Sequence, residues 1–205
     1  MKTITFEAKN LEEAKTYAEQ SLRLHRDYIS FSTEEKRSML GFKKSLSVTA
    51  AIDIDFESFG KTTLETMLEN MGIDDATIES SVEGDNEFSY AINSSENPVL
   101  IGKNGKTLDA IQFYMRNLLN LFSDKRVIVL VDVGGYKANR RKQLEILATK
   151  TAKEVAKTKI EVKLDPMNAY ERRIIHTKLS DWRDVVTTSE GDKGNRHIVI
   201  KPRQK

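Results

Sequence analysis

The chain of 205 residues contains no cysteine, only three prolines and only ten glycines. Without cysteine it has no disulfide, no thiolate metal ligand and no cysteine nucleophile. With so few prolines and glycines it has no long flexible linker that would hold domains far apart. No run approaches the roughly 18 apolar residues of a membrane span, and the first residues do not begin a signal-peptide hydrophobic block. We therefore expect compact domains in a cytoplasmic protein.

Charge is nearly balanced over the whole chain but unevenly distributed along it. The formal net charge is +2, whereas residues 134–205 hold 18 Lys and Arg against 9 Asp and Glu. Between residues 45 and 97, Lys61 is the single base among 12 acids. A basic C-terminal third favours a polyanionic partner there, and the acidic middle would repel one. Selection for solubility also produces such a division, so both interpretations are open at this point.

Hydrophobic periodicity predicts the order strand, helix, strand, strand for residues 1–55. A helix capped by Asn10 follows the first strand, and further strands are expected over residues 28–31 and 46–54. The segment between these strands is a basic loop that also carries large apolar side chains. Its candidate partner-binding residues are Lys36, Arg37, Met39, Leu40, Gly41 and Phe42. Either Met39, Leu40 and Phe42 pack into the core of their own domain, or the loop is an exposed contact surface for a protein partner.

Residues 56–133 carry the order helix, strand, strand, helix, Gly-x-x-Gly, helix, strand. Glycines let the backbone turn sharply and let a sugar-phosphate chain approach without a side-chain clash. The helix that follows the loop offers unpaired N–H groups and the positive end of its dipole. A Gly-x-x-Gly sequence alone is often an ordinary turn, but this element order makes it a candidate binding site. The residues of that site are Gly102, Lys103, Asn104, Gly105 and Lys106.

In residues 134–205 a long basic helix is followed by a strand over residues 160–164 and by a helix that is capped by Asn168 and extends to about Trp182. A polar loop over residues 187–195 then leads to a strand over residues 196–201. On a wheel of 100° per residue, one edge of the second helix is basic and the opposite side is apolar. The basic edge holds Arg172, His176 and Arg183, and the apolar side holds Tyr170, Ile174, Ile175, Leu179 and Trp182.

The basic edge is either a solvated face or a row of contacts to successive phosphates. The only histidines are His25, His176 and His197, and no two of them are spaced as a metal-ligand pair. No carboxylate or hydroxyl is placed by the sequence beside His176 for catalysis. We therefore expect no metal, no cofactor and no enzymatic activity.

Residues 101–108, Ile-Gly-Lys-Asn-Gly-Lys-Thr-Leu, with the helix and hairpin before them, resemble a type II KH domain. Residues 166–176, Pro-Met-Asn-Ala-Tyr-Glu-Arg-Arg-Ile-Ile-His, together with residues 189–191 and 195–202, resemble the R-3-H signature. Both modules behind a small N-terminal domain resemble the Jag family over essentially the whole chain. The resemblance implies an α+β protein of three small domains: a β-α-β-β Jag N-terminal domain (1–55), a type II KH domain (56–136) and an R-3-H domain (137–205).

The chain departs from the family pattern in two places. The usual Lys-Lys-Gly-Phe-Leu-Gly loop reads Lys-Arg-Ser-Met-Leu-Gly over residues 36–41, and the long charged linker of many relatives is reduced to about residues 53–59.

The resemblance also implies a function, namely a bacterial protein that binds single-stranded RNA, with single-stranded DNA as a second candidate ligand. KH domains clamp about four nucleotides at the Gly-x-x-Gly loop. The residues expected to contact a second stretch of strand are Arg172, Arg173, His176, Arg183, Arg196 and Lys201. Post-transcriptional control linked to cell elongation, cell shape, envelope synthesis or sporulation is implied. Pairing with a small separate KH-domain protein is implied as well, and a homo-oligomer is compatible with the sequence.

The alternative is an interaction adaptor. In this hypothesis the N-terminal domain docks on a membrane-associated protein at the inner face of the membrane, and RNA binding is secondary.

Overall fold

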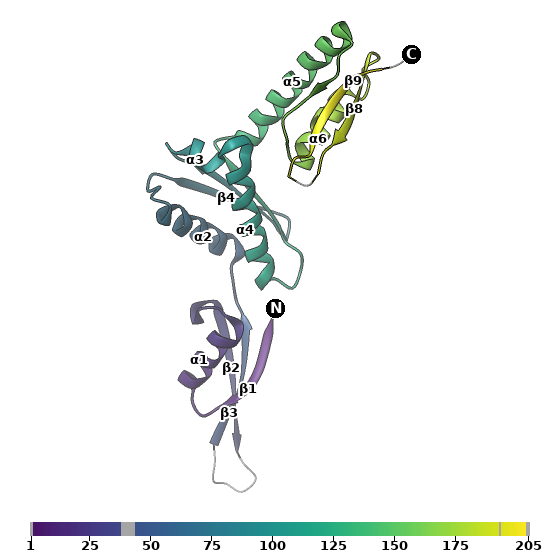
Figure 1. Cartoon of the computed structure of the whole chain (residues 1–205). Helices are drawn as coiled ribbons and strands as arrows, with labels where there is room; N and C mark the ends of the chain where they lie inside the picture. The colour runs from purple at the N-terminus through teal and green to yellow at the C-terminus, as the bar shows by residue number, and fades with distance from the viewer. Residues whose placement is uncertain (1, 38–43, 193, 204–205) are drawn as a thin grey trace. The chain divides into compact units, whose positions relative to one another are not determined.

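The computed structural model describes residues 2–37, 44–192 and 194–203 (Figure 1). Within these residues there are three small sheets of three strands each, so the fold is α+β, the class expected from the sequence. The chain divides into two compact units. The first unit comprises residues 1–100 and 107–132, and the second comprises residues 101–106 and 133–205. Each unit is described separately below.

The first sheet is built from the N-terminal residues. Its elements are β1 (Thr3–Ala8), α1 (Leu11–Leu22), the short 3-10 helix η1 (Arg26–Tyr28), β2 (Ile29–Arg37) and β3 (Lys44–Ile52). The strand order is β1-β3-β2, with antiparallel pairing on both sides of β3. The side chain of Asn10 accepts a hydrogen bond from the Glu13 backbone N–H at 2.8 Å, which starts α1 where the sequence predicts.

The basic loop predicted between the second and third strands is shorter than expected. Antiparallel pairing of β2 with β3 continues to Arg37 opposite Lys44, so Lys36 and Arg37 lie in a strand. The loop prediction for these two residues was therefore wrong, because ladder hydrogen bonds extend the hairpin beyond its apolar part. The other candidate partner-binding residues lie outside the described residues; they are Met39, Leu40, Gly41 and Phe42.

The second sheet follows the helix and strand order expected for residues 56–133. Its elements are α2 (Phe56–Asn70), β4 (Thr77–Glu83), β5 (Glu87–Asn93), α3 (Asn97–Ile101), the 3-10 turn η2 (Lys103–Gly105), α4 (Lys106–Phe122) and β6 (Ile128–Val133), with strand order β4-β5-β6. Leu64 and Leu68 of α2 and Met115 of α4 are among its fully buried side chains. Within the first unit, the Phe59 ring of α2 contacts the rings of Tyr28 and Phe122 at centroid distances of 5.1 and 5.8 Å.

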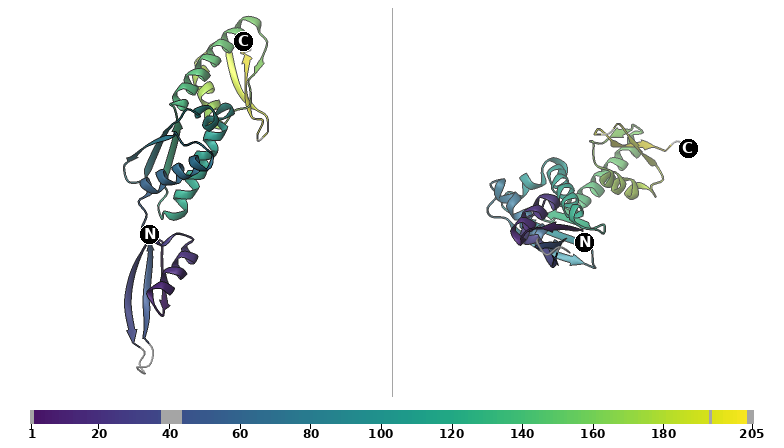
Figure 2. Two further views of the ribbon diagram at one scale, coloured as in Figure 1. Left: turned by 90° about the vertical axis from the view of Figure 1, so that its left-hand side faces the viewer. Right: turned by 90° about the horizontal axis from the view of Figure 1, so that it is seen from below.

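The third sheet and its helices form most of the second unit. Its elements are α5 (Tyr136–Thr158), β7 (Val162–Lys163), α6 (Ala169–Leu179), β8 (Val185–Glu190) and β9 (His197–Pro202), with strand order β7-β9-β8. Figure 2 shows α5 as one continuous helix. Its Leu144 and Ala152 share one buried cluster with Ile175 of α6 and with Ile198 and Ile200 of β9. Both helices therefore pack on the same face of the sheet.

Three expectations for this unit need correction. The strand expected over residues 160–164 contains only Val162 and Lys163. The helix expected to reach Trp182 ends at Leu179, where the chain turns so that Trp182 can pack against the core. The loop expected over residues 187–195 begins as strand β8, because Thr187 to Glu190 pair with β9.

Within the described residues, no helix combines the length and apolarity that a membrane crossing requires.

A close contact between Gly60 and Tyr90 joins α2 to the second sheet. Tyr90 is 1% exposed, and its hydroxyl donates a hydrogen bond to the Phe56 carbonyl at 3.0 Å. Burial raises the pKa of the Tyr90 hydroxyl, so it stays protonated as a donor. A Cβ atom at Gly60 would lie 2.0 Å from the Tyr90 hydroxyl oxygen. Glycine is therefore required here by packing rather than by backbone conformation.

We predict that Gly60→Ala destabilises the protein by about 1–3 kcal/mol, because the added methyl overpacks a filled site. This change in stability is opposite in sign to the one that helix propensity predicts, since alanine is normally favoured over glycine within a helix by about 1 kcal/mol. Urea denaturation measures the change. Ser58→Ala, at an exposed position on the same helix, is the matched control, and equal or higher stability of Gly60→Ala would contradict the packing argument.

Candidate nucleic-acid interface

The Gly-x-x-Gly loop has a backbone conformation that few residue types can adopt. Gly102 has φ 68° and ψ −178°, a region that is essentially restricted to glycine. Asn104 has φ 55° and ψ 34°, the left-handed region that asparagine tolerates better than most residues. Gly105 has φ 76°, and its N–H donates to the Gly102 carbonyl at 3.3 Å. The loop therefore depends on the two glycines and the asparagine for its shape.

The surroundings of the loop leave its charged side chains available. Gly105 is buried, and a Cβ atom there would lie 2.8 Å from the ring of Tyr136, the first residue of α5. Lys103 and Lys106 are exposed, and their side chains make no hydrogen bond or ion pair with any other described residue. Because α4 begins at Lys106, its first backbone N–H groups follow the loop directly. This arrangement can bind an anion such as a phosphate.

The start of the helix before the loop is held by Asp75. Its carboxylate accepts hydrogen bonds from the Ser94 hydroxyl at 2.6 Å and from the Ser95 backbone N–H at 2.8 Å. These hydrogen bonds lower the pKa of Asp75 to about 2, and the bond from Ser94 has the largest effect. The turn that they fix precedes α3, which leads to Gly102.

The second candidate site is carried by α6, whose first turn is fixed by Glu171. Asn168 and Glu171 form a capping box, in which each side chain accepts a hydrogen bond from the other residue's backbone N–H. The same Glu171 carboxylate accepts a hydrogen bond from Arg140 Nε of α5 at 2.8 Å. The Glu171 and Arg140 side chains are only 7% and 22% exposed, so this is a largely buried ion pair. It sets both the start of α6 and its orientation against α5.

Arg172 and Arg196 meet at the backbone of Met167. The Met167 N–H donates to the Arg196 carbonyl at 3.1 Å, and its carbonyl accepts a hydrogen bond from the Arg172 guanidinium at 2.9 Å. Met167 therefore connects the Arg172 side chain to the backbone of Arg196, although the two arginines are far apart in the sequence.

His176 and Arg196 also contact neighbouring positions on β8. His176 Nδ1 lies 2.6 Å from the Thr187 hydroxyl, and Arg196 Nε donates to the Ser189 hydroxyl at 3.3 Å. Thr187 and Ser189 are two residues apart, so their side chains share one face of the strand. We name Arg172, His176 and Arg196 together the β8 edge. Its cations and hydrogen-bond donors can contact successive phosphates.

The structure does not bring Lys201 to the β8 edge. Lys201 Nζ pairs with the Glu190 carboxylate at 2.6 Å, and the Thr188 hydroxyl donates to the same carboxylate at 2.8 Å. Thr188 and Glu190 alternate with Thr187 and Ser189, so they lie on the opposite face of β8. The hydrogen bond between the pair lowers the pKa of Glu190 and raises that of Lys201, so both groups stay charged and occupied with each other.

Arg183 is exposed but does not belong to α6. The wheel that placed it beside Arg172 assumed a helix that continues to Trp182. Because α6 ends at Leu179, that argument for Arg183 was wrong.

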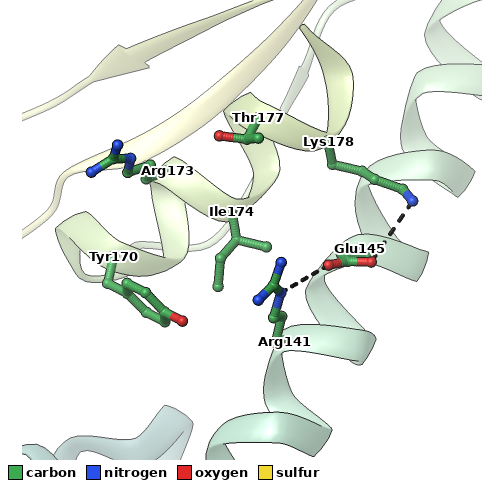
Figure 3. Close-up of a pocket in the computed structure, with 7 residues that line it drawn as sticks. All are labelled: Arg141, Glu145, Tyr170, Arg173, Ile174, Thr177 and Lys178. Carbon is green, nitrogen blue, oxygen red and sulfur yellow. Dashed lines mark hydrogen bonds and ion pairs between the residues drawn. The ribbon is translucent and has the colours of Figure 1, made fainter. Parts of the chain in front are cut away.

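The helical wheel also misplaced Tyr170, which it assigned to the apolar side of the helix. Tyr170 is 63% exposed and, with Arg173, lines a hollow of about 380 Å³ between α5 and α6 (Figure 3). A signal was present in the sequence, because Tyr170 lies about 140° around a helix from the buried Ile175, outside the half that packs.

Within residues 2–37, 44–192 and 194–203, no cluster of three or more His, Asp or Glu could hold a metal ion.

We predict that Asp75 contributes to stability in a pH-dependent way. Its folded pKa of about 2 lies below its ordinary value of 3.8, so the contribution is present above that ordinary value and is lost as the pH falls toward 2. An NMR titration of the Asp75 carboxyl measures the pKa directly. Ser94→Ala should raise it, whereas Ser58→Ala should leave it unchanged; a titration midpoint near 3.8 in the wild type would refute the assignment.

We predict that Glu171→Gln lowers the free energy of unfolding by about 1–3 kcal/mol, because it leaves Arg140 largely buried without its counter-charge. Glutamine still supports a capping box, so the substitution isolates the ion pair. Urea denaturation followed by the fluorescence of Trp182, the single tryptophan, reports on this unit. The control Glu145→Gln removes more exposed ion pairs and should cost less than about 1 kcal/mol. Equal effects of the two variants would contradict the role given to Glu171.

Comparison with known proteins adds to this geometry. Residues 142–202 match the R-3-H domain family. The RNA-binding protein KhpB of Clostridium symbiosum is 34% identical over 205 residues, which cover 98% of this chain and 91% of that protein. The protein of the same name from Bacillus subtilis is 33% identical over 207 residues, which cover 98% of each chain. A KhpB from Streptococcus pneumoniae is 33% identical over 62% of this chain and 40% of its own. The chain therefore belongs to the KhpB family, also called the Jag family.

Proposed function

We propose that this protein binds single-stranded RNA through two sites and carries out no catalysis. The observation that carries the proposal is the loop from Gly102 to Gly105. Its three positive φ angles need glycine or asparagine, it ends at the start of α4, and two lysines with unpaired side chains flank that start. A backbone that lacks side chains at two positions and lies next to a helix N-terminus is suited to a sugar-phosphate chain.

The β8 edge is the proposed second site. It combines the guanidinium groups of Arg172 and Arg196 with the imidazole of His176, and the exposed Arg173 follows Arg172 on α6. Its location in the segment that matches the R-3-H family and the name of the relatives, RNA-binding protein, support a role in RNA binding. Two modest sites on one chain raise affinity when one strand can occupy both. Arg183 and Lys201 are assigned at most peripheral contacts, because the first lies beyond α6 and the second is paired with Glu190.

The cellular role follows from the family resemblance. We infer post-transcriptional control in the cytoplasm, linked to cell elongation, envelope synthesis or sporulation. The three sheets fall within residues 1–55, 56–136 and 137–205, which supports three domains with these bounds. A small KH-domain partner, a homo-oligomer and docking on a membrane-associated protein stay predictions.

We predict that Gly102→Asp/Gly105→Asp and Arg172→Ala/His176→Ala each weaken binding of single-stranded RNA by at least about 10-fold, as expected when several phosphate contacts are lost. The first pair strains the loop, displaces Tyr136 and adds two negative charges. The second removes donors from the β8 edge. Fluorescence anisotropy with a labelled pool of random 12-nucleotide RNA measures the dissociation constants.

The control for the loop variant is Gly84→Asp. Gly84 also has a positive φ of 61°, and a Cβ atom there meets nothing within 4 Å, so the variant reproduces the backbone strain and the negative charge of one of the two substitutions without touching the loop. Wild-type affinity should fall steeply between about 50 and 200 mM salt. If wild type and both double variants bind alike in moderate salt, the proposed function fails.

A further inference from the structure

A groove between α5 and α6 lies beside the proposed second site. It has a volume of about 380 Å³, and its walls include Arg141 and Glu145 from α5 and Tyr170, Arg173, Ile174 and Lys178 from α6. In Figure 3 the side chains of Tyr170, Ile174 and Arg141 point toward one another across the groove, while Arg173 lies on the outer side of α6. All of these residues belong to the second unit. We name this feature the α5–α6 groove.

Tyr170 gives the groove an unoccupied aromatic face. The side chain is 63% exposed, and its ring makes no contact with another aromatic ring or hydrogen bond among the described residues. It is the second residue of α6, where the capping box and the Arg140–Glu171 ion pair hold the backbone. An exposed ring on a fixed backbone is a platform on which a base can stack at little cost in conformational entropy.

The charge of the groove favours an anion beside that ring. Arg141 and Lys178 share the single carboxylate of the walls, Glu145, at 3.1 and 3.7 Å. Arg173 is exposed, and its side chain has no hydrogen bond or ion pair within the described part of the chain. The groove thus carries three cations against one acid. A neighbouring hollow along α5 continues the positive charge with Lys142, Lys150 and Lys153.

Arg173 connects this groove to the β8 edge. On a helix of 100° per residue it lies about 60° from His176 on one side and about 60° from Tyr170 on the other. A strand that crosses α6 from His176 would therefore pass Arg173 before it reaches the ring of Tyr170. In that order the phosphate of a nucleotide would meet Arg173 and its base would meet the ring of Tyr170.

We propose that the α5–α6 groove binds one nucleotide of the RNA strand, with its base stacked on Tyr170 and its phosphate on Arg173. The proposal rests on the proposed function, because the same strand supplies the nucleotide. The base enters between Tyr170 and Arg141, where the guanidinium group covers its other side. The Glu145 carboxylate lies at the base edge rather than at the phosphate, since it would repel the latter.

The test compares Tyr170→Ala with Tyr170→Phe in the full chain, using the labelled pool of random 12-nucleotide RNA. Loss of one stacked base should weaken binding by about 5- to 10-fold, and Tyr170→Phe should stay within about 2-fold of wild type because it keeps the ring. Tyr17→Ala removes a tyrosine of similar exposure (51%) from α1 and should bind as wild type does. Thermal denaturation of each variant checks that it is folded.

Salt titrations separate stacking from phosphate contact. Arg173→Ala should reduce the slope of log Kd against log salt concentration by about 1, whereas Tyr170→Ala should leave the slope unchanged. If wild type binds RNA and folded Tyr170→Ala binds equally well, the groove proposal is overturned while the proposed function stands. If wild type itself does not bind, both are overturned.

Discussion

The buried ion pair between Arg140 and Glu171 determines the geometry of the second unit's proposed site. One carboxylate joins α5 to α6 and also completes the capping box that starts α6. The helix is only 11 residues long, so its own propensity contributes little and its position depends on this first turn and on packing. Arg172, Arg173 and His176 follow Glu171 within a turn and a half. Their directions are therefore set by a residue that need not touch the ligand.

The two proposed sites would recognise a strand by different physics. The loop would work through its backbone, because glycine at positions 102 and 105 removes side chains and the first N–H groups of α4 follow directly. The β8 edge would work through the side chains of Arg172, His176 and Arg196, which are held by hydrogen bonds to Met167, Thr187 and Ser189. A rigid backbone site fixes the register of a strand, whereas cationic side chains add affinity that salt can screen.

Local signals in the sequence were enough to predict the caps at Asn10 and Asn168 and the Gly-x-x-Gly loop between two helices, because each depends on residues within one turn. Tertiary contacts decided the rest. Pairing with β9 turns Thr187 to Glu190 into a strand despite their polarity, and core packing of Trp182 ends α6 early. The ion pair of Arg140 with Glu171 joins residues 31 apart, and no pattern within either helix indicates it.

The division of charge gains a physical meaning from this architecture. The 12 acids of residues 45–97 lie in the first unit, on α2, on the β4–β5 hairpin and in the turns around them, whereas residues 134–205 with their 18 bases lie in the second unit. The loop from Gly102 to Lys106 is grouped with the basic unit although its neighbours in the sequence belong to the acidic one. The acidic unit repels a polyanion, and the basic unit attracts one. A protein that is nearly neutral overall can thus direct a strand to one unit, because the acidic unit disfavours binding and the basic unit favours it.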